Sequence, residues 1–150
     1  MKNTRCLACA LALAVAAWTP APLLASPRCY PTTRFVVLAG GLVRDTLSQL
    51  VWQQQASSTT MNWAAAKTYC SSTGSGFRLP TVKELVSLVD LAVTSGATIN
   101  QTAFPGTPAE GFWTSSQWPG SPYYAWNVNF LNGYSFVFDV GYYRRARCVR

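Results

Sequence analysis

The chain has 150 residues and a formal net charge of +7, from twelve lysines and arginines against five acids. It contains no histidine, which excludes Ser-His-Asp and Cys-His catalytic arrangements and most zinc or copper sites. After residue 26 there is neither a Cys-x-x-Cys pair nor a glycine-rich phosphate loop of the usual patterns. We therefore expect no enzyme activity, no metal site and no cofactor.

The first 26 residues have the pattern of a secretory signal peptide. Lys2 and Arg5 make the start basic, an apolar run extends from Cys6 to Ala17, and small residues stand near Ala25. The apolar run is shorter than the roughly 20 residues that a transmembrane helix needs. The alternative is an N-terminal anchor that is never cut. We expect cleavage, no transmembrane segment afterwards, and a periplasmic, cell-surface or secreted location.

The rest of the chain has the length of one domain. We predict a lead-in segment over 27–33 and a single domain over 34–150. Cations are concentrated at its end, where four arginines fall within the last seven residues. Such clustering in an exported protein favours an anionic partner, such as an acidic glycan or another polyanion, and no pattern indicates a specific nucleic acid. The alternative is a surface that is basic without a ligand.

Three cysteines follow the predicted signal peptide: Cys29, Cys70 and Cys148. An exported chain meets an oxidising compartment, so we expect a disulfide. Because three is an odd number, one cysteine is left free or pairs with another chain.

Short strands are predicted first, over Phe35–Leu38, Leu42–Asp45 and Leu50–Gln53, with a turn at Gly40-Gly41. A helix follows, for which Asn62 is the predicted N-cap. Within it, an apolar face recurs at three- and four-residue spacing and should point into the core. Its members are Trp63, Ala66 and Cys70.

A second helix has a stronger start signal. Thr81 and Glu84 have the spacing of a capping box, in which each side chain bonds the other residue's backbone amide. This makes a structural role for Glu84 more plausible than a catalytic one, and Arg78 is expected to bond carbonyls or a carboxylate nearby. The predicted buried stripe consists of Val82, Leu85, Leu88 and Val89.

In the second half of the chain, the sequence predicts a long loop over 96–111 and then several strands. These strands are Phe112–Ser115, Tyr124–Leu131, Tyr134–Val140 and Tyr142–Val149, with a hairpin turn at Asn132-Gly133. In the second of them, Trp126, Val128 and Phe130 alternate with Asn127 and Asn129. The order of elements predicts an α+β domain with two helices and a mostly antiparallel sheet.

An ordered set of motifs resembles the Lcl C-terminal domain family, a family of domains of unknown function, over residues 34–150. The motifs are Asp45, Leu50-Val51-Trp52-Gln53, Trp63, Ala66, Cys70, Arg78-Leu79-Pro80-Thr81, Glu84-Leu85, Phe104-Pro105, Phe112-Trp113-Thr114-Ser115-Ser116, Val128, Phe130, Gly133 and Arg147-Cys148-Val149-Arg150. The resemblance implies a C-type-lectin-like fold and binding of sulfated glycosaminoglycans. It also implies trimerisation, but no collagen-like repeat precedes the domain here, so a homo-oligomer remains only possible.

Two details qualify the resemblance. Gln49 stands where the family usually has glycine, so the turn there should differ. The stretch from Arg78 to Glu84 is also similar to the formylglycine-generating enzymes, but their reactive cysteine arrangement does not fit cysteines committed to structure. We expect Cys70, on the inward helix face, to bond Cys148, which follows the last strand of the family pattern.

The predicted ligand site lies around the last predicted strand. Alternation along that strand points Ala146 and Cys148 inward and places Arg145 and Arg147 together on the other face. The alternative for Arg147 is an internal ion pair with Asp90, Asp139 or Glu84. The candidate ligand-binding residues are Arg144, Arg145, Arg147, Trp118, Tyr142 and Tyr143.

The sequence therefore predicts an exported, non-catalytic module that binds acidic or sulfated glycans. Arginine suits such ligands because its planar fork donates paired hydrogen bonds to carboxylate and sulfate groups. Calcium is not expected, because the five acids are scattered and hard cations need clustered oxygen ligands. The alternative is a structural or protein-interaction domain of the cell envelope.

Overall fold

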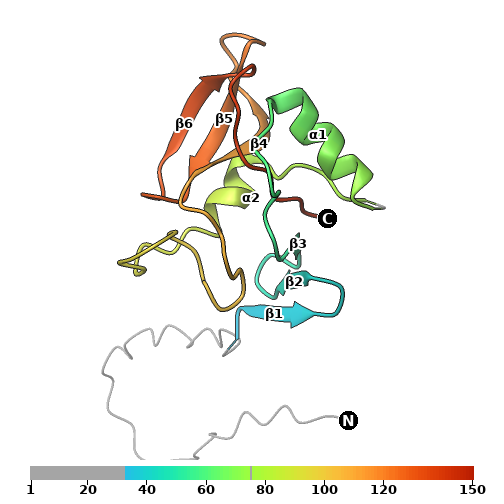
Figure 1. Cartoon of the computed structure of the whole chain (residues 1–150), viewed down its shortest axis with the longest axis vertical. Helices are drawn as coiled ribbons and strands as arrows, with labels where there is room; N and C mark the ends of the chain where they lie inside the picture. The colour runs from blue at the N-terminus through green and yellow to red at the C-terminus, as the bar shows by residue number, and fades with distance from the viewer. Residues whose placement is uncertain (1–32, 75) are drawn as a thin grey trace, which may run out of the picture.

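The computed structural model describes residues 33–74 and 76–150, which form an α+β fold of two helices and two three-stranded sheets (Figure 1). The predicted signal peptide, Cys29 and most of the lead-in segment lie outside the described residues. In chain order the elements are β1 (Phe35–Leu38), β2 (Leu42–Asp45), β3 (Val51–Gln53), α1 (Trp63–Ser72), α2 (Val82–Val86), β4 (Gly111–Gln117), β5 (Tyr124–Asn129) and β6 (Ser135–Asp139).

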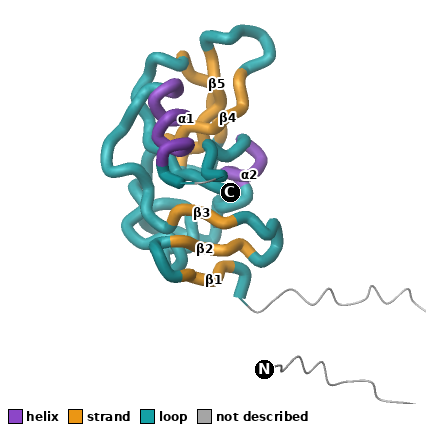
Figure 2. Tube along the Cα trace, turned by 90° about the vertical axis from the view of Figure 1, so that its right-hand side faces the viewer, coloured by secondary structure: helices purple, strands orange, loops and turns teal. Residues whose placement is uncertain are grey.

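The first sheet is a meander of β1, β2 and β3, and its strands agree with those that the sequence predicted. Gly40 and Gly41 join β1 to β2 with φ angles of +77° and +69°. Two successive residues in the left-handed region are what a tight hairpin of the favoured twist requires, and glycine adopts them without steric cost. This sheet lies at one end of the molecule, away from β4 and β5 (Figure 2).

The second sheet has the order β4-β5-β6 and is also antiparallel. The predicted hairpin at Asn132-Gly133 is confirmed: Gly133 has φ +77° and its amide donates to the Asn129 carbonyl at 2.8 Å. The simple alternation predicted for β5 is wrong. Asn127 is only 1 % exposed and Trp126 is half-buried, because both faces of this strand are covered.

Both helices begin where the sequence predicted. The Asn62 side chain accepts from the Ala65 amide at the start of α1, and the Trp63 indole donates to the Thr114 carbonyl at 2.7 Å, which fastens α1 to β4. Thr81 and Glu84 form the complete capping box of α2. Neither helix of the described chain is long and apolar enough to cross a membrane.

Residues 144–150, called the terminal segment below, do not form the strand predicted over Tyr142–Val149. They make isolated bridges instead, because their backbone pairs in turn with separate parts of the chain. Arg144 exchanges two hydrogen bonds with Met61, Cys148 accepts from the Gln53 amide, and Arg150 exchanges two with Val51. The dark red end of the chain accordingly runs from the second sheet toward β3 (Figure 1).

The predicted disulfide between Cys70 and Cys148 is confirmed, and it ties α1 to the terminal segment across 78 residues of sequence. Both cysteines are fully buried in one core cluster, together with Trp113 of β4 and Ala125 of β5. A larger cluster holds Leu85 and Leu88 of the predicted stripe, with Val82 and Val89 packed at its margin.

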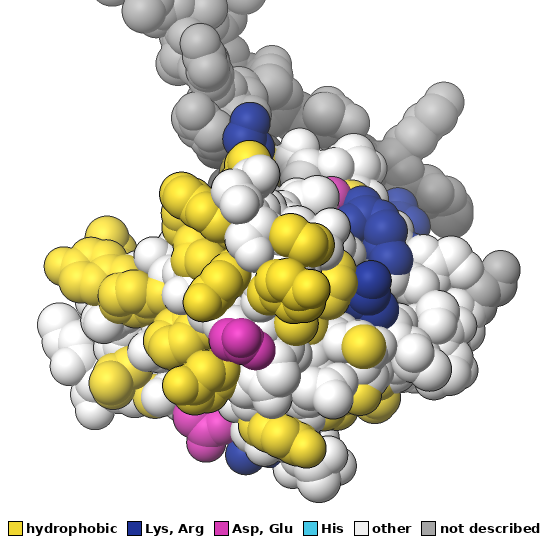
Figure 3. All heavy atoms as spheres, turned by 90° about the horizontal axis from the view of Figure 1, so that it is seen from above, with side chains coloured by type: hydrophobic (Ala, Val, Ile, Leu, Met, Phe, Trp, Pro, Cys, Tyr) yellow, Lys and Arg dark blue, Asp and Glu magenta, His cyan; other side chains and the backbone are white. Residues whose placement is uncertain are grey.

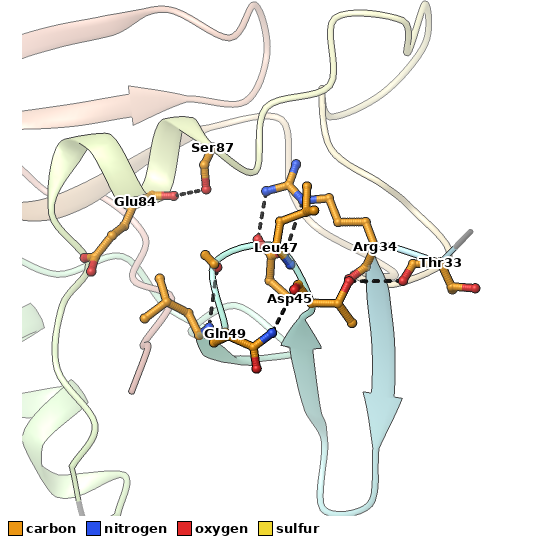
Figure 4. A network of polar contacts seen from close by, with 10 residues as sticks. Thr33, Arg34, Asp45, Leu47, Gln49, Glu84 and Ser87 are labelled. Atoms are coloured by element: carbon orange, nitrogen blue, oxygen red, sulfur yellow. Dashed lines mark hydrogen bonds and ion pairs between the residues drawn. The ribbon is translucent and has the colours of Figure 1, made fainter. Parts of the chain in front are cut away.

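Gln49 has a φ of +62° and is the one residue other than glycine with a positive φ in the described chain. The turn that holds it is rich in polar contacts (Figure 4). Asp45 pairs with Arg34 at 2.8 Å and accepts from the Leu47 amide, while the Gln49 amide group donates to the Thr46 carbonyl at 2.7 Å. Gln49 thus adopts a left-handed conformation that glycine would take without steric cost.

Loss of the disulfide should destabilise the fold strongly. We expect Cys70→Ala/Cys148→Ala to lower the free energy of unfolding by about 4 kcal/mol, because the bond restricts a long loop in the unfolded chain. Denaturant titration measures this, and Cys29→Ala, which leaves the bond intact, should match the wild type. Peptide mapping that finds Cys29 linked to Cys70 or Cys148 would contradict the assignment in solution.

Gln49→Gly should stabilise the protein by about 0.5–1 kcal/mol, because removing Cβ relieves a left-handed strain that outweighs the greater freedom of unfolded glycine. Gln49→Ala keeps Cβ and loses the hydrogen bond to Thr46, so it should destabilise. Thermal melts of both variants test the pair. A Gln49→Gly protein that melts below the wild type would show that the side-chain bond matters more than the strain.

Candidate functional site

Arg147 is not a surface cation, and the prediction that it shares an exposed face with Arg145 is wrong. Its side chain is fully buried, with the guanidinium 4.6 Å from the centre of the Phe104 ring and one nitrogen donating to Thr107 Oγ1 at 2.7 Å. Nε and Nη1 have no hydrogen-bond partner among the described residues, and no acid pairs with it there. Burial lowers the pKa of Arg147 to about 9, so it remains charged at neutral pH.

Arg145 is committed to internal contacts. Its Nε pairs with Glu110 at 2.9 Å, and Nη1 donates to the carbonyls of Ser57 at 3.2 Å and Ser58 at 2.6 Å. These bonds fasten the loop after β3 to the start of β4. Arg145 therefore offers a ligand little unpaired charge, contrary to the expectation from the sequence.

Trp118 is exposed, but it lies apart from the other candidate ligand-binding residues. Its ring packs edge-on against Trp126 at 5.5 Å, and neighbouring residues of a strand point to opposite faces. Trp126 thus faces away from Asn127, and Trp118 lies on the side of the second sheet opposite to the cavity described next.

The structure brings Arg144 and Tyr143 together at a cavity of about 530 Å³ beside the second sheet. Its polar lining comprises Thr60, Glu110, Asn127, Asn129 and Arg144. Its aromatic lining comprises Phe136, Phe138 and Tyr143, and Gly111 completes it. Tyr142 stands next to the cavity and is 56 % exposed.

Strand register explains why these side chains meet. Gly111 pairs with Asn129, and Asn127 pairs with Phe136, so residues from all three strands share one face. A Cβ at Gly111 would lie 2.8 Å from Cδ of Arg144. The missing side chain therefore lets Arg144 lie across the sheet.

Arg144 lies over an aromatic surface. Its guanidinium is 4.4 Å from the centre of the Phe138 ring and 5.8 Å from that of Tyr142. Tyr134, Phe136, Phe138 and Tyr142 form a continuous aromatic row, with successive ring centres 6.4, 6.3 and 5.7 Å apart. Figure 3 shows hydrophobic side chains spread over the upper face of the molecule, with basic side chains to one side.

Of the lining residues, sequence reasoning named only Tyr143 and Arg144, and the most informative one that it missed is Asn127. Its Nδ2 is buried and has no hydrogen-bond partner among the described residues. A buried donor without an acceptor costs about 1–3 kcal/mol, so an acceptor in the cavity would recover free energy there. The one signal in the sequence was the pair of asparagines, Asn127 and Asn129, on a single face of a predicted strand.

The arrangement is chemically suited to binding a polar ring compound. Aromatic faces receive apolar ring surfaces, amide groups exchange hydrogen bonds with hydroxyls, and a guanidinium binds an acidic group. Within residues 33–74 and 76–150, no three Cys, Asp or Glu side chains gather closely enough to hold a metal ion.

Arg78, Thr81 and Glu84 have the structural role that the sequence predicted. The Arg78 guanidinium donates two bonds to Glu84, at 2.9 and 2.7 Å, and Glu84 also accepts from the Thr81 amide at 2.7 Å. The hydrogen bonds from Arg78 are the main reason that the pKa of Glu84 is lowered to about 2, and burial opposes this shift.

Comparison with known proteins assigns the chain to a family. The sequence profile of the Lcl C-terminal domain matches residues 41–150, and the protein belongs to this family. Among solved structures, the crystal structure of rhodocetin is similar to it with a TM-score of 0.44 and 14% sequence identity, over 79% of this chain and 94% of that one. No curated protein matches.

Acid should weaken the fold through Glu84. Because its pKa is depressed in the folded state, its contribution is present above the ordinary value of 4.5 and is lost as the pH falls toward 2. We expect this contribution to be about 1–2 kcal/mol, since half-exposed Arg78 is screened by solvent. Denaturant titration of wild type and Glu84→Gln between pH 7 and 2 measures it. Equal pH slopes for the two proteins would contradict the assignment.

Proposed function

We propose that this protein is an exported, non-catalytic module that binds acidic or sulfated glycans, and that the cavity with the aromatic row is its binding site. The observation that carries the proposal is the placement of Arg144, a cation without an ion pair in the described chain, over Phe138 and next to the unpartnered amide of Asn127. The proposal thus keeps Arg144, Tyr142 and Tyr143 of the sequence prediction. It adds Asn127 and leaves out Arg145, Arg147 and Trp118.

Sugar chemistry fits these groups. One face of a pyranose ring presents C–H groups and packs on aromatic rings, while its hydroxyls need planar polar partners at the edge. Phe136 and Tyr143 supply aromatic surface, and Asn127 and Asn129 supply amides. An acidic substituent would meet the Arg144 guanidinium.

A binding role rather than catalysis is supported by what surrounds the cavity. Catalysis of the common acid-base kind needs a positioned proton donor or acceptor. The acid that lines the cavity, Glu110, is paired with Arg145, and the chain contains no histidine.

The family resemblance also leads us to propose a C-type-lectin-like fold, with which two helices, two antiparallel sheets and a helix-to-terminus disulfide are compatible. An experimental structure compared with lectins of this fold tests it. Export is likewise our proposal, supported by the basic and apolar pattern of the first 26 residues.

A role in protein interaction within the cell envelope is the second candidate. It is favoured by β1, an edge strand on which Val36 and Val37 are 40 % and 52 % exposed. An exposed apolar edge is a template for pairing with another strand.

Binding to immobilised heparin, dextran sulfate and an acidic glycan array, with and without calcium, tests the first proposal. We expect the wild-type protein to be retained at low salt and Arg144→Gln to bind at least about tenfold more weakly, the loss of roughly one charge-assisted contact. Arg44→Gln is the matched control, because Arg44 is exposed on β2 and outside the cavity. Absence of retention on every acidic glycan would overturn the function, and equal loss in both variants would overturn the site.

A further inference from the structure

Several cations of the described chain have no ion pair with an acid, but most of them lie outside the cavity; these are Arg44, Lys67, Lys83 and Arg150. Arg34, Arg78 and Arg145 each form an ion pair with an acid, and Arg147 is buried. Arg144 is the one cation that lines the cavity at the second sheet. The site therefore offers a ligand a single positive charge rather than a basic track.

The guanidinium of Arg144 is arranged for a planar anion. Its Nη1 donates to the Tyr143 carbonyl at 3.0 Å, and its other N–H groups have no partner among the described residues. The group is held over the Phe138 ring, so its plane is fixed more firmly than that of a free surface arginine. A guanidinium in one orientation binds a carboxylate through two parallel hydrogen bonds.

Asn127 stands beside this group. A Cβ placed ideally on Gly111 would lie 3.1 Å from Arg144 Nε and 3.4 Å from Asn127 Oδ1. The two side chains thus converge where Gly111 leaves space. Because Asn127 Nδ2 is covered, an acceptor reaches it only when a neighbouring side chain shifts.

We propose that this cavity takes one carboxylated sugar residue, a hexuronate, with its carboxylate on Arg144, an oxygen accepting from Asn127 Nδ2, and its ring against Phe136 and Tyr143. This inference rests on the proposed function and narrows it from acidic glycans in general. A sulfated chain draws its affinity from several cations, whereas the cavity has one. Binding should accordingly depend on the carboxylate and only weakly on salt.

Isothermal titration calorimetry with matched ligands tests the chemical class. The ligands are free glucuronate, a glucuronate-containing oligosaccharide, the same oligosaccharide with its carboxyl groups reduced, and the reduced oligosaccharide after sulfation. We expect the carboxylated oligosaccharide to bind, carboxyl reduction to weaken binding at least tenfold, and sulfation not to restore it. Binding of free glucuronate would identify a monosaccharide site, and binding of the oligosaccharide alone would identify a site for polymer.

Other results separate the two proposals. If no oligosaccharide of this series binds but another acidic glycan retains the protein, the hexuronate assignment is wrong and the proposed function stands; if no acidic glycan binds at all, the proposed function fails. If the sulfated form binds as tightly as the carboxylated one, or the reduced form loses nothing, glycan binding stands and the hexuronate assignment is wrong.

Variants of the cavity residues then test whether the ligand binds there. Gly111→Ala puts a methyl group against the Arg144 side chain and should weaken binding of the carboxylated oligosaccharide at least tenfold. Asn127→Ala should weaken it several-fold, and Arg44→Gln should leave it within twofold. Thermal melts identify any variant that has lost its fold. If one has, Arg144→Lys tests the site instead, because it keeps the charge without the planar fork. It should also bind the carboxylated oligosaccharide at least tenfold more weakly. Unchanged affinity in a folded Gly111→Ala or Arg144→Lys protein would overturn the proposal.

Discussion

The terminal segment, residues 144–150, bonds to four separate parts of the chain. Its backbone bonds Met61 before α1, Gly111 at the start of β4, Arg78 before α2, and Val51 in the first sheet. Buried backbone groups need partners, so each of these four regions is satisfied only when the segment is in place. The disulfide at Cys148 adds a covalent restraint at the middle of the segment.

The same segment determines what the cavity can contain. Its arginines have different partners although they are close in sequence: Arg144 an aromatic surface, Arg145 an acid and two carbonyls, and Arg147 a buried ring. A count of charges would treat them alike. Their local surroundings decide which one holds the fold together and which one is available to a ligand.

Sequence reasoning succeeded where the signal was local. The Thr81–Glu84 capping box and the turns at Gly40-Gly41 and Asn132-Gly133 depend on residues a few positions apart, and each was predicted correctly. It failed for Arg147 and Asn127, whose burial depends on elements distant in the sequence. Arg147 contacts Phe104, and Asn127 lies beneath a space that exists because residue 111 is glycine. Neither contact produces a periodic pattern in the sequence from which it could be predicted.

Because Arg150 exchanges two hydrogen bonds with Val51, β3 is completed by a segment that is distant in the sequence. Contacts between residues so far apart slow folding, because the entropy of closing the intervening loop is lost before the contact is gained. The disulfide between Cys70 and Cys148 lies inside that loop. Once formed, it keeps the terminal segment near α1 while the remaining backbone pairs of the segment form.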